Sequence, residues 1–325
     1  RAPGRLRGLL LNNAAVVAFA GGDAERAREL NAEALRVKQA THGARSIEVA
    51  YTLTNLAMLH ADPDERARRM QDALAIFEDQ FGPAHPETIE ARIAASLYVR
   101  DPEAARRLLR PGCDALERFA APDVAQRARC LYTLGHHARE AGAEDDARLL
   151  LRRAAELVDE AGDGAGLRLV DRTLIRGYPA LDVGGSADIV RQVRDALEAS
   201  PGDEWWQRRS RAELELLHGL LLAAAGDLDS AERALQASID DFTAVADEAR
   251  DVLRHQRLAR ARVALVHASL AGHPSSETLD RAHEQLAAAE RWYRDGGDAY
   301  AWRLVELKEL EHRILQIRRQ PRNSP

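Results

Sequence analysis

The feature that most constrains this chain is a unit of about 42 residues that recurs along it. A glycine, a short polar stretch and an alanine open part of the unit at Gly22–Ala27, Gly142–Ala147 and Gly226–Ala231. A small residue then recurs at intervals of 39, 42, 39, 42, 42 and 51 residues, at Ala34, Ala73, Ala115, Ala154, Ala196, Ser238 and Ala289. Self-similarity at such a period is typical of arrays in which each unit packs only on its neighbours.

Each unit has the pattern of a helix, a tight turn and a second helix. Apolar residues three or four apart predict the first helix, as at Leu9, Leu10, Ala14 and Val17. Gly21–Gly22 ends that helix, because glycine tolerates the left-handed conformation at a helix end. Asp23 follows as the N-cap of the second helix. Asp62–Pro63 and Asp101–Pro102 repeat this signal, with proline at the first helical position.

Composition supports helix over strand and limits the kinds of protein to consider. Of the 325 residues, 46% are hydrophobic but only 5% are aromatic, which suits helices and excludes wholesale disorder. No apolar run approaches the roughly 18–20 residues that cross a bilayer, so we expect no membrane partner. The net charge of −6 is evenly spread, so we expect no nucleic-acid partner either. We read the chain, which opens at Arg1, as a fragment of a longer cytoplasmic protein.

Residues 8–160 resemble tetratricopeptide repeats of the kinesin-light-chain type. The resemblance is carried by Leu11-Asn12-Asn13-Ala14-Ala15, by Thr54-Asn55-Leu56-Ala57 and by the linker Gly82-Pro83-Ala84-His85-Pro86. It implies an all-α, TPR-like α-solenoid, a right-handed superhelix of about seven helix pairs closed by a C-terminal capping helix. Such arrays occur in the C-terminal regions of bacterial Ser/Thr kinases and in other multidomain signalling proteins.

We expect one continuous array over residues 1–318. Regular repeats occupy about 8–160, an irregular centre 161–200, further repeats 203–295 and the capping helix 298–318, with a flexible tail at 319–325. Gly162–Gly166 and Gly177–Ala180 interrupt the pattern, so helix stacking should be weakest in that centre.

The sequence carries no motif for catalysis, a cofactor or a metal, so we expect none of the three. Phosphate-loop, dinucleotide-binding and zinc-protease motifs are missing. His136 and His137 are neighbours that point about 100° apart on a helix, so we expect one in the groove and one half-buried. Cys113 and Cys130 should be buried free thiols on adjacent helices. Trp205–Trp206 either packs on the previous repeat or anchors a partner.

The resemblance also implies a concave groove lined by fixed positions of each first helix. Transferred to this chain, those positions give the candidate partner-binding residues Asn12, Val16, Tyr51, Thr54, Met58, Arg129, Tyr132, His136 and Arg139. Asn12 matches the asparagine that holds the backbone of an extended peptide in such grooves. Asn13 and Asn55 are expected to make structural bonds between helices instead.

The sequence therefore predicts a non-catalytic scaffold or sensor region that binds a peptide or protein on its concave face, within a larger signalling protein such as a Ser/Thr kinase. Two alternatives remain open. The chain could be a peptide-gated regulator whose superhelical pitch changes on binding, or a purely structural oligomerisation array.

Overall fold

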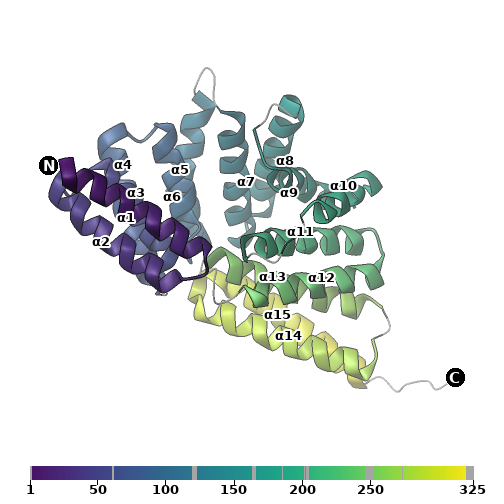
Figure 1. The fold of residues 1–325 in the computed structure, drawn as a ribbon. Helices are drawn as coiled ribbons and strands as arrows, with labels where there is room; N and C mark the ends of the chain where they lie inside the picture. The colour runs from purple at the N-terminus through teal and green to yellow at the C-terminus, as the bar shows by residue number, and fades with distance from the viewer. Residues whose placement is uncertain are drawn as a thin grey trace. The chain divides into compact units, whose positions relative to one another are not determined.

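The protein is an all-α, TPR-like solenoid of consecutive helix pairs (Figure 1). The computed structural model describes residues 2–60, 62–118, 123–162, 166–184, 186–200, 202, 205–245, 252–272 and 274–319. Within these ranges there is no strand, and the α-helices are α1 (Ala2–Ala20), α2 (Ala24–His42), α3 (Ile47–Leu59), α4 (Pro63–Phe81), α5 (Pro86–Ser96), α6 (Pro102–Arg118), α7 (Val124–Glu140), α8 (Glu144–Ala161), α9 (Leu169–Ala180), α10 (Ala187–Glu198), α11 (Trp205–Ala224), α12 (Leu228–Ala244), α13 (Val252–Ala271), α14 (Ser276–Asp295) and α15 (Ala301–Arg319). The predicted fold class, including the final unpaired helix, is confirmed.

The turns within the pairs follow the predicted chemistry. Gly22, Gly142 and Gly226 have φ angles of 83°, 78° and 84°, a left-handed conformation that favours glycine. Asp23 caps α2 by accepting a hydrogen bond from a backbone N–H, and Asp227 caps α12 in the same way. These two signals fix where the second helix of a pair begins.

Two further glycines allow the helices of a pair to approach closely. Gly135 on α7 and Gly219 on α11 are 84 residues apart, two periods of the repeat. A Cβ added at Gly135 would lie 2.8 Å from Leu151 Cγ of α8, and one at Gly219 would lie 2.6 Å from Leu235 Cγ of α12. The repeat therefore includes a position where the partner helix occupies the space of a side chain.

The contacts divide the chain into two compact units. Unit 1 comprises residues 1–100, 104–122 and 250–252, and unit 2 comprises residues 101–103, 123–249 and 253–325. Helices α1 to α5 belong to unit 1, and α7 to α12, α14 and α15 belong to unit 2. The single continuous array stays a prediction.

The core of unit 1 lies where α3, α4 and α5 meet. Val49 and Leu53 of α3 pack with Met70 and Phe77 of α4, and Ala91 of α5 closes the cluster. Val49 and Leu53 are four residues apart and Met70 and Phe77 are seven apart, so each pair lies on one apolar face of its helix.

Unit 2 has three successive clusters instead of one central core. The first joins α8, α9, α10 and α11, the second joins α11, α12 and α13, and the third joins α13, α14 and α15. In the third, α15 buries Leu307, Leu310 and Ile314. Each helix pair therefore covers the apolar face of the one before it, as stacked repeats require.

The predicted irregular centre contains a helix pair, α9 and α10. Helix α9 is well anchored, with Leu174 and Tyr178 in the first cluster of unit 2. Helix α10 buries only Val193 and Ala196. Residues 163–165 and 185 lie outside the described part of the chain. Within this pair, the second helix, α10, therefore buries fewer side chains than the first, α9.

Candidate binding site

The first helices of the pairs in unit 2 bring polar side chains together on their shared inner side. Nη1 of Arg257 on α13 lies 3.0 Å from Nδ1 of His136 on α7, across 121 residues of sequence. The Arg257 guanidinium also stacks over the ring of Tyr178 on α9, 5.7 Å from its centroid. These contacts show that the part of the inner side between α7, α9 and α13 is filled by the protein's own residues.

A second contact of this kind joins the end of α7 to the start of α15. The indole Nε1 of Trp302 donates a hydrogen bond to the backbone carbonyl of Glu140, at 3.1 Å. The Glu140 carboxylate lies 3.7 Å from Nη2 of Arg303. Helix α7 is therefore tied to both α13 and α15 through hydrogen bonds and an ion pair.

Burial sets the protonation of the groups in this cluster. Burial, together with the charges of Arg257 and Arg260, holds the pKa of His136 well below its ordinary value, so this imidazole is neutral at pH 7. Its Nδ1 then accepts the hydrogen bond from Arg257. Burial also raises the pKa of the Tyr132 hydroxyl well above 10. Burial alone would lower the pKa of Arg257, but the Glu213 carboxylate 3.4 Å away, together with Tyr178, Tyr132 and Glu140, outweighs it and raises the pKa, so Arg257 stays charged.

Several buried polar atoms of the cluster have no hydrogen-bond partner among the described residues. They are the hydroxyls of Tyr132 and Tyr178, Nε2 of His136 and Nη1 of Arg260. Buried polar atoms are almost always satisfied in folded proteins, by protein groups, by water or by a ligand. Water or a ligand would have to supply the missing partners of these atoms.

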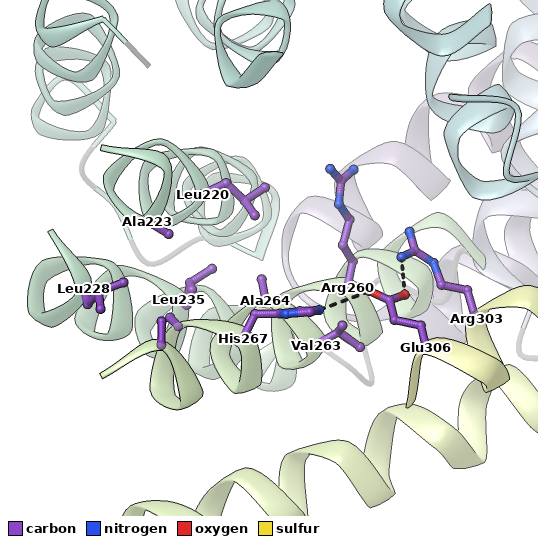
Figure 2. A pocket seen from close by; sticks show the side chains of 12 residues that line it. Leu220, Ala223, Leu228, Leu235, Arg260, Val263, Ala264, His267, Arg303 and Glu306 are labelled. Atoms are coloured by element: carbon purple, nitrogen blue, oxygen red, sulfur yellow. Dashed lines mark hydrogen bonds and ion pairs between the residues drawn. The ribbon is translucent and has the colours of Figure 1, made fainter. Parts of the chain in front are cut away.

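A pocket of about 380 Å³ opens beside this cluster (Figure 2). Its floor is one face of α13, formed by Arg260, Val263, Ala264, His267, Ala268 and Ala271. Leu220 and Ala223 of α11 and Leu228 and Leu235 of α12 supply an apolar wall, and Arg303 and Glu306 of α15 complete the lining. The pocket thus has one apolar end and one charged end, and its volume lies in the range of known ligand sites.

The charged end is only partly neutralised by the chain itself. Glu306 accepts hydrogen bonds from His267 Nε2 at 3.2 Å and from Arg303 Nη1 at 2.8 Å. Burial opposes its ionisation, but these two partners outweigh it and lower the pKa of Glu306 to about 2. Arg260 makes none of the contacts drawn in Figure 2, and its guanidinium lies over the Tyr178 ring, 5.4 Å from the centroid.

The nine candidate residues divide between the two units. Of those in unit 2, Tyr132 and His136 lie in the cluster, with ring centroids 4.4 Å apart. Arg139 is only 6% exposed and lies 3.5 Å from Glu144, and Arg129 is partly buried. The predicted split of the histidine pair is wrong, since His136 and His137 are both buried. Side chains that were expected to line an open groove are packed inside the unit.

In unit 1 the burial of two neighbouring asparagines is the opposite of what the sequence predicted. Asn12 was expected to face the groove, but it is buried, and its Oδ1 accepts a hydrogen bond from the Thr52 hydroxyl at 3.2 Å. Lys38 Nζ donates to the same hydroxyl at 3.0 Å. Asn13, expected to bond between helices, is exposed. The predicted exposed position is displaced by one residue, from Asn13 to Asn12, which corresponds to a rotation of about 100° around the helix.

The other candidates in unit 1 remain accessible. Val16, Tyr51 and Met58 are all more than 40% exposed, and the Tyr51 hydroxyl donates to Glu87 at 2.9 Å. Thr54 is partly buried and donates to the backbone carbonyl four residues earlier. A partner role for these residues stays a prediction.

The sequence interpretation missed Tyr178, Arg257, Arg260 and the residues of α15. The repeat itself contained part of the signal. Tyr178 follows His136 by 42 residues, and Leu220 follows Tyr178 by another 42. His136, Tyr178 and Leu220 therefore occupy the same position of the repeat. Continuing the groove positions past residue 160 would have added Tyr178 and Leu220 to the candidates.

Three further expectations concern cysteine, tryptophan and metal. Neither Cys113 nor Cys130 is a free thiol, since both are disulfide-bonded, and that expectation is wrong. The side chains of Trp205 and Trp206 lie outside the described residues, as does the tail from residue 320. Among the described residues, no group of three or more His, Cys, Asp or Glu could hold a metal ion. None of the described helices is long and apolar enough to span a membrane.

Comparison with known proteins supports the fold alone. No protein-family model and no curated protein matches the chain. Among solved structures, a Rap protein complexed with Competence and Sporulation Factor is similar, with a TM-score of 0.55 and 18% identity over 95% of this chain and 77% of that one. An IFIT1 monomeric mutant with m7Gppp-AAAA matches 96% of this chain and 69% of that one at 15% identity and a TM-score of 0.42. The human IFIT1 dimer with m7Gppp-AAAA matches 95% of this chain and 68% of that one, at 14% identity and a TM-score of 0.43. The likeness to the Rap protein supports the helical-repeat fold and nothing further, and the expected lack of a nucleic-acid partner stays a prediction.

Proposed function

We propose that this chain is a non-catalytic scaffold that binds a peptide or protein partner on the inner side of its helix pairs. The observation that carries the proposal is the pocket along α13, where Arg260, which forms no ion pair within the described part of the chain, adjoins an apolar wall. A surface that combines hydrocarbon with an unneutralised charge is suited to amphipathic partners. The likeness to the Rap protein, itself solved in complex with a factor, is compatible with this class of function.

The wider setting is part of the same proposal. We place the chain in a larger cytoplasmic signalling protein, such as a bacterial Ser/Thr kinase, on the basis of the kinesin-light-chain-type motifs in residues 8–160. In that setting the array would recruit a partner, and the catalytic work would belong to another domain.

A second candidate, a peptide-gated regulator, is favoured by the contacts across unit 2. The bonds from Arg257 to His136 and from Trp302 to Glu140 join helices that are not neighbours in the array. A partner that bound better to an array lacking those bonds would shift the equilibrium between two curvatures.

The test is selection of peptides from a random library with free C-termini, displayed against the immobilised chain, followed by isothermal titration of the enriched sequences. The scaffold function predicts saturable binding of a few related sequences. An absence of enrichment over a chain unfolded in urea would contradict it. For the regulator, small-angle scattering should show a change in radius of gyration on binding of the same peptide, and an unchanged radius would count against it.

A further inference from the structure

We propose that the pocket along α13 takes the C-terminal residue of the partner peptide, with its carboxylate paired to Arg260 and its apolar side chain against the alanines of α13. This assignment rests on the proposed scaffold function and specifies the chemistry of its ligand.

Arg260 is the cation of the pocket that lacks a carboxylate. Arg303 pairs with Glu306 at 2.8 Å, and Arg257, behind the pocket, lies 3.4 Å from Glu213. Among the described residues Arg260 has no such contact, and its Nη1 is shielded from water without a hydrogen-bond partner. Burial, with the nearby charges of Arg139 and Arg257, lowers the pKa of Arg260, and the charge of Glu140 opposes this only in part. An anion entering the pocket would restore the missing interaction, and a carboxylate matches the forked donors of a guanidinium.

The rest of the floor is suited to hydrocarbon. Arg260 and Ala271 are eleven residues apart on one face of α13, which corresponds to about 16 Å along the helix. Between them the small side chains of Ala264 and Ala268 leave room above the helix, and Leu235 of α12 lines the same pocket. A cavity of about 380 Å³ accommodates a large apolar side chain and the main chain that carries it.

The charged end favours a peptide terminus over a fatty acid. Glu306 lies beside Arg303 at this end, and its carboxylate can accept a further hydrogen bond. A C-terminal residue offers both a carboxylate for Arg260 and an amide N–H for Glu306, whereas a fatty acid offers a carboxylate but no donor for Glu306.

An internal acidic residue is also less suitable. Its backbone would continue past the pocket in both directions, along helices whose own backbone groups are already hydrogen-bonded to one another. The peptide groups buried there would lack partners, which is unfavourable. A terminus places a single peptide group in the pocket.

The experiment is a titration of methyl-labelled protein, observed by NMR through the Leu and Val methyl groups that line the pocket. The probes are N-acetyl-Ala-Leu-Leu with a free carboxylate, the same tripeptide with a C-terminal amide, and decanoate. The full chain is used as it stands, and as the variants Arg260→Met and Arg233→Met. Arg233 is an exposed arginine of α12 outside this pocket, so its variant is the matched control. Ala264→Leu, which fills the pocket without touching a charge, is a second variant.

We expect the free tripeptide to shift the methyl signals of Leu220, Leu235 and Val263, and the amide to bind about tenfold or more weakly. Arg260→Met should remove this difference, Ala264→Leu should weaken both tripeptides, and Arg233→Met should change neither.

Three results would overturn the assignment. They are equal binding of the acid and the amide, an acid–amide difference that persists in Arg260→Met, and decanoate binding in place of the tripeptide. A library-selected peptide that binds the Arg260→Met and Ala264→Leu variants as tightly as the natural chain would also overturn it, yet would leave the scaffold function standing. If no selected peptide binds at all, the scaffold function fails with it.

Discussion

The guanidinium of Arg257 lies 3.0 Å from Nδ1 of His136, although 121 residues separate them. In an open array these two residues would belong to repeats that never touch, because each repeat contacts only its neighbours. Their contact shows that unit 2 curves until its first helices meet on the inner side. The buried polar cluster and the pocket along α13 both depend on this curvature.

The pair of Arg257 and Glu213 should be strongly coupled. Replacing Arg257 by Met leaves the Glu213 carboxylate buried without its partner, so we expect a loss of about 3–5 kcal/mol in the free energy of unfolding. The double variant Arg257→Met, Glu213→Gln should lose less than the two single variants together. Urea unfolding of the four proteins gives this coupling. As a control, Arg294→Met removes an exposed pair with Glu290 and should cost at most about 0.5 kcal/mol. A loss of unfolding free energy in the double variant equal to the sum of the two single losses would contradict the pairing.

The close approach of α11 and α12 makes Gly219 intolerant of any side chain. Alanine is the better helix former by about 1 kcal/mol, yet its Cβ would lie 2.6 Å from Leu235 Cγ and 3.2 Å from a backbone carbonyl of α12. We expect Gly219→Ala to lower stability by about 1–3 kcal/mol. Gly272→Ala, where a Cβ meets nothing within 4 Å, should be close to neutral. Thermal unfolding of both variants is the measurement, and a stabilised Gly219→Ala would contradict the packing.

Glu215 should make the stability of unit 2 fall as the pH rises towards neutral. Burial and the nearby charge of Asp241, partly offset by Arg211, raise the pKa of Glu215 from 4.5 to about 7. Between these two values the folded chain keeps a proton that the unfolded chain has lost, so stability is full below pH 4.5 and is lost as the pH rises to about 7. We expect Glu215→Gln to be more stable than the natural chain at pH 8 by about 1–2 kcal/mol, after allowance for solvent screening of this half-buried group. The two proteins should converge near pH 4.5, and parallel pH profiles would be inconsistent with this prediction.

Helix α10 should open more readily than its neighbours. It buries two side chains, Val193 and Ala196, whereas α8 buries six. Local opening requires less free energy where fewer apolar contacts are lost. We expect backbone amides of α10 to exchange with deuterium faster than those of α8. Equal protection of the two helices would show that the predicted weak centre of the array does not exist.

Local rules were enough to predict the fold. Asp23 and Gly22 act within a single turn, so their sequence context alone specifies where a helix begins and ends. The face on which a side chain lies is harder to predict, because a shift of one residue rotates it by about 100°. That shift separates buried Asn12 from exposed Asn13.

The binding surface required more than local rules. The contact between Arg257 and His136 depends on the sum of many small packing angles, and no short pattern encodes that sum. The repeat period could have predicted Tyr178, which lies 42 residues after His136, but it could not have predicted Arg260. What makes Arg260 a candidate is that it forms no ion pair among the described residues, and this can be seen only once the helices are placed together.

The central claim is that the partner binds on the inner side of unit 2, and one titration tests it most directly. A library-selected peptide is titrated calorimetrically into the natural chain and into Arg260→Met, Met58→Ala and Arg129→Ala. The account predicts that Arg260→Met weakens binding about tenfold or more, whereas Met58→Ala in unit 1 leaves it unchanged. Arg129→Ala shows whether the partner extends along α7. Unchanged affinity for Arg260→Met, together with a clear loss for Met58→Ala, would contradict the account and place the partner on the first repeats instead.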